Sequence, residues 1–558
     1  MSSQRPMSQG SVAEKDTAAS EQNGSRKGAR FWVIFSVLNF CLFLSALELY
    51  SVPNALPTIA SDLHSETEYV WVGSAYTLAS TAFLPFSGGI AEAFGRRPAL
   101  LTCMGLFFLG SGICGGASSI GMMIAGRTVQ GLGGGAIQGV TAIILSDMVT
   151  LEERGLYQSA FSVTWSIANF ASPIIGGALA TSGRWRWLFY MNLPLAGVAG
   201  LVAFLFMDLP TPPGSLVEKL KKLDWIGNAI VMASTTSVTI ALTWGGVTYP
   251  WDSARVLAPL IVGCFGFVLF FVYEAKFASY PLVPWIVLSN RTSFSGYLQS
   301  FFLGIAALGV VYYIPVYFQA THGSTPIQSG VLTLAFCVLA PASIIAGTLV
   351  KKTGRYRPQL WVGWVLLMIG LGLLSTINAN TSISRTLGFL VLIGFGMGLT
   401  YAAVVFPVQA PLSPSLNAPA LSFFQFTRIF SGVWGVTIGS TVLQNELSHR
   451  LPSTFLASFP QGVSVAYAAI PKINEIDDPV VQAAVRESFA SSLRVLWEAL
   501  IGIAGIGALA SLFMRGLALH KVKDEKWATK PVIRSNRSQE EKEAGNPSST
   551  PERQAEEN

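Results

Sequence analysis

The chain has 558 residues, of which 51% are hydrophobic and only 12% are charged, and it contains 54 glycines and 35 phenylalanines. Soluble domains carry roughly 25% charged residues, so this composition leaves too little polar surface to cover a water-soluble protein. The formal net charge of +6 is small for this length, and we expect no nucleic-acid partner.

Polar tails are expected at both ends of a membrane-embedded body. Residues 1–29 and 521–558 lack hydrophobic periodicity, and the first tail has no apolar core of the kind found in a cleavable signal peptide. Between the tails, windows of roughly 20 mostly apolar residues, enough to cross about 30 Å of hydrocarbon, recur fourteen times. They are 32–52, 70–91, 98–119, 121–145, 158–181, 187–207, 226–245, 255–274, 294–318, 329–350, 358–377, 385–408, 420–443 and 495–516. Since backbone in lipid must satisfy its own hydrogen bonds, the sequence predicts an all-α integral membrane protein with fourteen transmembrane helices.

The basic residues of the short loops predict the orientation, because cytoplasmic loops carry more Lys and Arg. If the N-terminus is cytoplasmic, the inner loops hold Arg96, Arg97, Arg154, Lys219, Lys221, Lys222, Lys276, Arg291, Lys351, Lys352, Arg355 and Arg357. The short outer loops then hold only Arg184, Arg186, Arg255 and Arg385. Twelve basic residues in the inner loops against four in the short outer loops predict that both termini face the cytosol. The long outer segment is expected at about 445–493, and it ends in an amphipathic stretch.

The stretch GGIAEAFGRRP, residues 88–98, lies in the expected inner loop between the second and third spans. Part of its pattern recurs in GTLVKKTGRYRP, between the tenth and eleventh spans. Gly88, Gly95 and Arg96 are matched at a constant offset by Gly347, Gly354 and Arg355. Two copies at the same place in two halves favour a duplicated bundle with parallel repeats, as in one large class of transporters.

Four motifs together resemble the major facilitator superfamily, and in particular its fourteen-span drug:proton antiporter branch. The first is the loop at 88–98, and the second is GRTVQGLGGGA in the fourth span, with Arg127, Gln130 and Gly131. The third, ANFASPIIGG, is similar to the fifth-span antiporter motif through Pro173, Gly176 and Gly177. The fourth combines ELYSVPNALPTIA in span one with WRWLFYMNLP between spans five and six. The branch usually has Asp where this chain has Glu48, and the superfamily usually has Asp where it has Glu92.

The resemblance implies two pseudo-symmetric six-helix bundles joined by two extra helices. We divide the chain into a tail (1–29), an N-terminal bundle (30–210), a linker with two transmembrane helices (211–290), a C-terminal bundle (291–520) with the outer loop at about 445–493, and a second tail (521–558). The implied function is proton-coupled efflux of amphipathic small molecules, such as drugs, toxins or secondary metabolites, by alternating access without a cofactor. A monomer in a fungal plasma membrane is expected, with the vacuolar membrane as the alternative.

The charged loop is interpreted as a cytoplasmic gating latch. Its glycines allow a tight reversal and a close backbone approach. Glu92 can pair with Arg96 or Arg97, or face the positive N-terminus of span thirteen near 418–422. Such a latch would hold the cytoplasmic side shut and break when the halves rock. The alternative is that the two arginines only enforce topology.

Charges within the spans cost at least roughly 2.5–3.5 kcal/mol each, so each one must face protein or water. Glu48 and Arg127 match family positions, and we predict that they couple transport to protons: Glu48 exchanges the proton, and Arg127 assists its release. In the alternative, Arg127 is structural and is satisfied by carbonyls and Gln130. Structural roles are expected for Arg428 and Glu498, and Asp147 needs no explanation beyond its place at a helix end.

Two other functions stay open. A carrier of siderophores or basic amino acids would need a pocket rich in carboxylates, and a non-transporting membrane sensor would need ordered cytosolic domains. An enzyme is not expected, because the sequence has no nucleophile–base pair, catalytic residue or metal-ligand spacing. The five cysteines lie unpaired in apolar runs, and the four histidines are scattered. GLGGGAIQG lies within an apolar span instead of following a strand, so it does not predict a nucleotide site.

Overall fold

The computed structural model describes residues 27–64, 70–246, 249–457, 459 and 465–519. Within these ranges the fold is built of helices, and the only β feature is a bridge between Gly245 and Tyr249. The prediction of an all-α protein is therefore confirmed.

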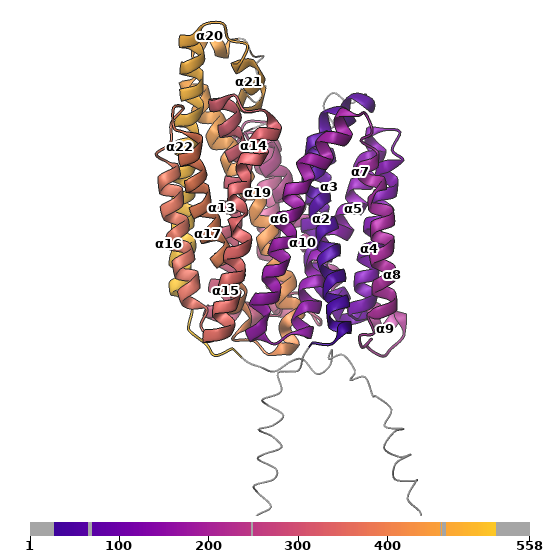
Figure 1. The fold of residues 1–558 in the computed structure, drawn as a ribbon. Coiled ribbons are helices and arrows are strands. Elements are labelled where there is room, and N and C mark those ends of the chain that lie inside the picture. The colour runs from indigo at the N-terminus through magenta and orange to yellow at the C-terminus, as the bar shows by residue number, and fades with distance from the viewer. Residues whose placement is uncertain (1–26, 65–69, 247–248, 458, 460–464, 520–558) are drawn as a thin grey trace, which may run out of the picture.

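The N-terminal half is a bundle in which α5 packs against α3 and α4, and α2 packs against α6 (Figure 1). Its helices are α2 (Ala29–Asp62), α3 (Val70–Phe94), α4 (Arg96–Gly115), α5 (Ile120–Met148), α6 (Leu151–Thr181), α7 (Trp187–Tyr190) and α8 (Asn192–Phe206). The linker then forms α9 (Leu216–Lys221), α10 (Trp225–Trp244), α11 (Ala254–Lys276) and α12 (Trp285–Ser289). Because α10 contacts both α3 and α19, this added pair of helices lies beside the junction of the halves.

In the C-terminal half, α13 packs against α19 and α22, and α17 packs against α15 and α16. The elements are α13 (Arg291–His322), α14 (Pro326–Thr333), η1 (Leu334–Val338), α15 (Leu339–Thr353), α16 (Arg357–Leu374), α17 (Ile383–Ala403), α18 (Val405–Gln409), η2 (Pro414–Leu416), α19 (Asn417–Arg450), α20 (Ser453–Leu456), α21 (Val465–Ile473) and α22 (Pro479–Leu512). Thr325 and Gln328 form a capping box that starts α14.

Among the described residues, 12 helical stretches are long and apolar enough to cross a membrane. Two further helices, α3 with 25 residues and α19 with 34, occupy the expected second and thirteenth spans but are not among these 12. They pack against each other where the halves meet, so polar residues on them can face protein instead of lipid. The multi-pass membrane fold is therefore clear, and the count of fourteen spans stays a prediction.

The outer segment differs from the prediction. Instead of a loop over about 445–493, α19 continues to Arg450 and α22 starts at Pro479, so the amphipathic stretch is the first part of the last long helix. Asp478 caps that helix through the Val480 N–H, and Val485 and Phe489 are buried on its inner side. The first part of α22 stays helical outside the apolar window because its apolar side chains are buried against protein instead of lipid. With α20 and α21, this extension projects beyond the rest of the molecule (Figure 1).

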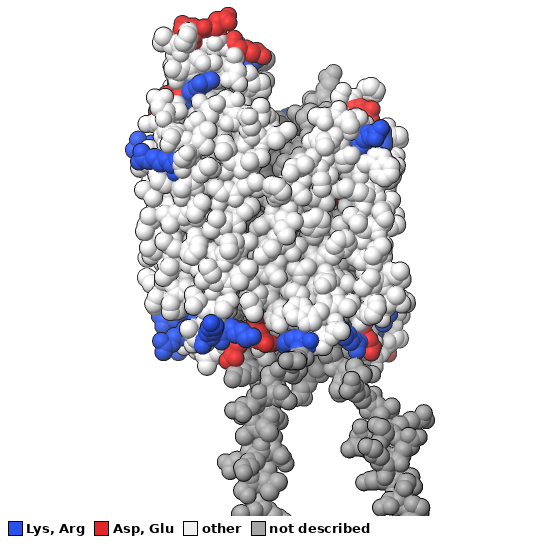
Figure 2. Space-filling view, viewed as in Figure 1, with Lys and Arg blue, Asp and Glu red and all other residues white. Residues whose placement is uncertain are grey.

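Both ends of the described chain lie at one end of the molecule, which we call the terminal face; the other end is the opposite face (Figure 1). The halves are in contact toward the terminal face and stand apart toward the opposite face. Figure 2 shows flanks almost free of charge, with Lys, Arg, Asp and Glu gathered at the two ends, as expected for a body embedded in lipid.

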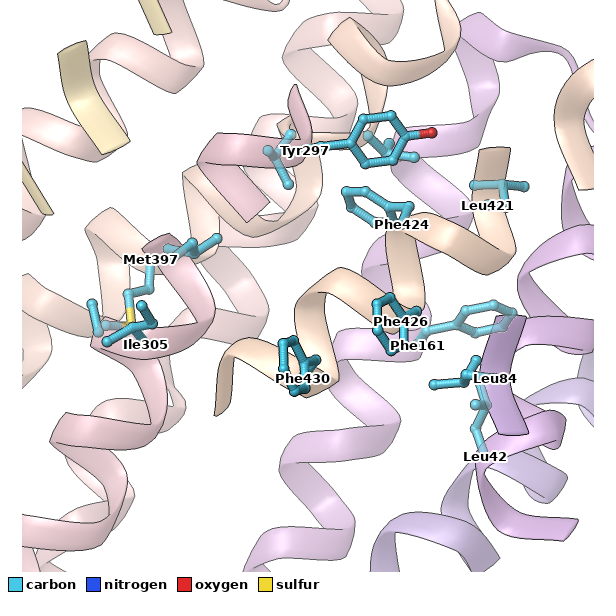
Figure 3. Close-up of a cluster of buried hydrophobic side chains, with 14 of the residues drawn as sticks. Leu42, Leu84, Phe161, Tyr297, Ile305, Met397, Leu421, Phe424, Phe426 and Phe430 are labelled. Carbon is cyan, nitrogen blue, oxygen red and sulfur yellow. The ribbon is translucent and has the colours of Figure 1, made fainter. Parts of the chain in front are cut away.

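One apolar cluster joins the two halves (Figure 3). Leu42, Leu84 and Phe161 enter it from α2, α3 and α6. From the C-terminal half come Tyr297 and Ile305 of α13, Met397 of α17, and Leu421, Phe424, Phe426 and Phe430 of α19. The aromatic side chains of α19 therefore lie at the contact about which the halves could move.

Candidate functional site

A buried ion pair joins α2 to α5. Arg127 Nη1 lies 2.7 Å from Glu48 Oε1, and both side chains are only 1% exposed. Taking a guanidinium and a carboxylate out of water costs several kcal/mol each, and mutual attraction repays this only with good geometry and further hydrogen bonds. The structure brings together the two residues that were predicted to act together, although 79 positions separate them.

Further hydrogen bonds complete the pair. Arg127 donates to the Gln130 side-chain oxygen at 2.7 Å and to the Val72 carbonyl at 2.9 Å. Asn192, at the start of α8, donates to the second Glu48 oxygen at 2.6 Å. Gln130 in turn donates to Ser111 of α4 at 2.8 Å. Five helices thus converge on one charged centre, which we call the Glu48–Arg127 centre.

Asn192 was missed as an individual site residue, although it lies in the quoted stretch WRWLFYMNLP. It is fully buried, and its amide contacts the carboxylate directly. A buried amide within an apolar helix needs a partner, so this polar residue in an apolar stretch was the available signal.

Glycines of α5 allow the close approach that encloses the centre. A Cβ at Gly131 would overlap the backbone of Tyr76 on α3, and one at Gly134 would overlap the Tyr76 side chain. This proximity places the Tyr76 ring 4.5 Å from the Arg127 guanidinium carbon, within the range of a cation–π interaction. Helix packing, and no nucleotide loop, explains the glycine-rich stretch.

The predicted latch charges hold together the α3–α4 turn. Arg96 contacts Glu92 at 2.9 Å and Asp147 of α5 at 2.8 Å, and the Arg96 and Asp147 side chains are both 2% exposed. The view that Asp147 needs no explanation was wrong, because it is the buried partner of Arg96. Arg97 turns away and donates to the Phe204 carbonyl of α8.

Contact between the halves at the terminal face passes through glycines of the two repeated motifs. A Cβ at Gly88 on α3 would overlap Ser422 of α19, and one at Gly347 on α15 would overlap the backbone at Gly155 of α6. The other glycine of each motif directly follows a helix, with φ of 95° at Gly95 and 64° at Gly354. The repeat noticed in the sequence therefore places a glycine with positive φ after a helix, and a glycine in close contact with the other half, in both copies.

Polar side chains also cross between the halves at this face. Arg154 of α6 donates to the Gln409 side chain of α18, and both residues are buried. Glu153 lies 3.0 Å from Lys27 and 3.4 Å from Lys351 of α15. Arg154 had been counted only as a topology charge. Lys351 stands in the second motif where Glu92 stands in the first, so the repeat conserves the position of a charge but not its sign.

The fifth-span motif and the small residues that precede it lie on α6. A Cβ at Gly177 would meet nothing within 4 Å, whereas Ala168 and Ser172, earlier on α6, are fully buried. Ser172 donates to the Leu47 carbonyl of α2 at 3.2 Å. The motif residues Pro173 and Gly176 also lie on α6. Ala168 and Ser172 thus place small buried side chains where α6 packs on α2.

The other two membrane charges differ from each other. Glu498 pairs with Arg494 at 3.0 Å on an exposed side of α22. Arg428 on α19 lies against the rings of Tyr401 and Phe424. Within the described residues, no group of three or more His, Cys, Asp or Glu side chains could hold a metal ion.

Comparison with known proteins gives a consistent result. A family model described as "Major Facilitator Superfamily" matches residues 38–436. "Efflux pump FUS6" of Gibberella fujikuroi is 38% identical over 503 residues, which cover 89% of this chain and 91% of that protein. "MFS efflux transporter aclA" of Aspergillus oryzae is 37% identical over 508 residues, which cover 90% of this chain and 92% of that protein.

Solved structures agree with the fold. The proton:xylose symporter XylE matches with a TM-score of 0.54 and 14% identity over 88% of this chain and 98% of that chain. The human organic anion transporter MFSD10 has the same TM-score and identity, over 86% of this chain and all of that chain. At such low identity, these likenesses concern the fold alone.

Proposed function

The chain belongs to the major facilitator superfamily and is a membrane transporter, and from this premise we propose that it exports amphipathic small molecules, such as drugs, toxins or secondary metabolites, in exchange for protons. The names of its fungal relatives support export as the direction. The observation that carries the proton exchange is the Glu48–Arg127 centre, a titratable ion pair buried within the N-terminal bundle.

In the proposed cycle, Glu48 takes up a proton while the halves are open toward the opposite face. Protonation removes the negative charge that faces Arg127, so the ion pair breaks and the guanidinium keeps only Gln130 and the Val72 carbonyl as polar partners. Rocking then exposes the centre to the terminal face. There Glu48 releases the proton and pairs with Arg127 again, which commits the transporter to the next export step. Because entry of protons is downhill, it drives the cargo out.

The contacts at the terminal face would form the gate. Arg96, held by Glu92 and Asp147, keeps the α3–α4 turn rigid, and this turn presents Gly88 to α19. We propose that Gly95 supplies the turn conformation and that Arg97 anchors it to α8. Opening toward the terminal face then requires α3 to leave α19 and α15 to leave α6.

We further propose that the terminal face is cytoplasmic, as the excess of basic residues in its loops suggests, and that the protein is a monomer in the plasma membrane. Figure 2 supports this orientation through the basic side chains along the terminal face.

Transport into inverted membrane vesicles tests the proposal. A panel of amphipathic compounds is offered to vesicles with an acidic lumen, with vesicles lacking the protein as the control. We expect uptake of some compounds that rises with the pH gradient and collapses when a protonophore dissipates it. Uptake that ignores the gradient would overturn the proton exchange, and no uptake of any compound would overturn export.

A further inference from the structure

Arg428 is a charged group that the proposed proton exchange does not use. It lies eleven residues into α19, about 16 Å along the helix axis from Asn417. Its guanidinium carbon is 3.7 Å from the centre of the Tyr401 ring and 4.6 Å from that of Phe424. Its Nη2 donates to the Tyr401 carbonyl at 3.4 Å, longer than the usual 2.7–3.2 Å, and its Nε is buried without a hydrogen-bond partner.

The contrast with Arg127 shows what Arg428 lacks. Arg127 has a carboxylate, an amide oxygen and a carbonyl as acceptors. None of the ion pairs among the described residues includes Arg428. Arg428 is half-buried. Two aromatic faces supply roughly 0.5–2 kcal/mol each, so they offset only part of the cost of removing a guanidinium from water. Because its guanidinium has no carboxylate partner among the described residues, Arg428 retains the capacity to bind an anion.

The surroundings of Arg428 reach across to the other half of the molecule. Tyr401 and Tyr312 belong to the C-terminal half, and both lie close enough to Tyr50 of α2 to interact with it electrostatically. The Tyr50 ring in turn packs against the ring of Trp165 on α6, with the two ring centres 6.0 Å apart. Arg428 thus adjoins a group of phenols that come from both halves, and a phenol can donate a hydrogen bond to an anion.

We propose that Arg428 binds the carboxylate of the transported molecule, so that the cargo is an amphipathic organic acid held between the halves. The planar guanidinium matches a carboxylate in a two-point contact. The rings of Tyr401 and Phe424 adjoin this position and offer contact area for the apolar part of the cargo. This inference rests on the proposed export function, because it names the cargo of that transporter.

Binding of three probes with one apolar body tests the inference. The probes are 1-pyrenebutyric acid, 1-pyrenebutanol and 1-pyrenebutylamine, and their affinities are measured on the purified full chain in detergent at neutral pH. We expect the acid to bind about tenfold or more tightly than the alcohol, because a charge-assisted contact in a desolvated site has that strength. Arg428→Gln should remove the preference and leave alcohol binding within about twofold. The matched control is Arg494→Gln on α22, which should behave as the wild type.

A second measurement uses the unaltered protein, so it does not depend on how a variant folds. Phenylglyoxal modifies arginines, and mass spectrometry follows the modification of Arg428; the acid should slow it and the alcohol should not. Equal affinity for acid and alcohol, a preference that survives Arg428→Gln, or modification unaffected by the acid would overturn the inference. Because no gradient is applied, these results are separate from the export test: a protein that prefers the acid but does not transport would refute export alone.

Discussion

Replacing Glu48 with glutamine removes the one charge on which the proposed coupling depends while it keeps the shape of the side chain. In the wild type, one Glu48 oxygen accepts from Arg127 at 2.7 Å and the other accepts from Asn192 at 2.6 Å. Breaking a buried pair by removal of one partner costs about 3–5 kcal/mol. Since glutamine still offers an acceptor to Arg127, the loss of stability should stay below that value, and the variant should remain folded.

The effect on transport should be larger than the effect on stability. For one proton exchanged per cargo molecule, each unit of pH difference supplies about 1.36 kcal/mol, or tenfold accumulation at steady state. With an inverted-vesicle lumen two units more acidic than the medium and no membrane potential, the cargo should therefore accumulate up to about 100-fold in the wild type. Glu48→Gln cannot exchange the proton, so we expect it only to equilibrate the cargo at any gradient.

The assay follows a labelled cargo in inverted vesicles at several lumenal pH values, with protein abundance measured in the same vesicles. Glu498→Gln is the matched control, because it removes a glutamate charge that pairs on an exposed side of α22, and it should accumulate cargo as the wild type does. Gradient-dependent accumulation by Glu48→Gln equal to that of the wild type would refute the assignment of the proton to Glu48.

Three further outcomes are expected. Asp147→Ala should lower the unfolding free energy by about 3–5 kcal/mol, whereas Glu92→Ala should lower it by less than about 1 kcal/mol, because both variants remove an acceptor of Arg96 but only the first contact is fully buried; similar losses in thermal unfolding would contradict this. Gly347→Val should prevent α15 from closing on α6 and raise maleimide labelling of a cysteine introduced at the buried Ser422, with Cys264 replaced by serine; Gly372→Val on α16, where a Cβ meets nothing, is the control, and equal labelling of the two variants would oppose the gating role. Hydrogen bonds from an arginine and a tryptophan next to α7 lower the pKa of Asp62, so its stabilising contribution is present above the ordinary pKa of an aspartate and is lost as the pH falls through the lowered value. After correction for the intrinsic pH dependence of amide exchange, protection of the amides around α7 should therefore fall at acidic pH in the wild type and stay level in Asp62→Asn. Parallel protection profiles in the two proteins would contradict this role of Asp62.

Much of the fold could be predicted because lipid imposes a strict length and composition on each span. Each expected window corresponds to a helix or to short consecutive helices in the structure. The start of α22 could not be found in this way, because it lies where protein packing and an Asp478 cap maintain the helix beyond the apolar window. Hydropathy identifies only the part of a helix that faces lipid. Along α19 and α22 the surroundings change from lipid to protein, so the apolar windows do not mark the ends of these helices.

Part of the candidate site could be predicted, because a charged residue within a membrane span has a free-energy cost that a partner must offset. A carboxylate or an arginine within an apolar span must find a partner, and this singled out Glu48, Arg127, Arg428 and Glu498 in the sequence. The match to family positions then selected Glu48 and Arg127. Asp147 was missed, because at a helix end a charge needs no partner, and its contact with Arg96 joins positions 51 residues apart. The incomplete surroundings of Arg428 likewise depend on what the fold brings near it, which one sequence does not state.

Distances between spin labels test the central claim, that the two halves rock so that one face closes as the other opens. One pair of labels replaces Thr211 and Arg355 at the terminal face, and another replaces Arg184 and Asn380 at the opposite face; all four residues are exposed. The exposed Cys264 is first replaced by serine. Lowering the pH and adding a transported compound should lengthen the first distance and shorten the second in some of the molecules. Two distances that stay constant, or that change in the same direction, would contradict the account.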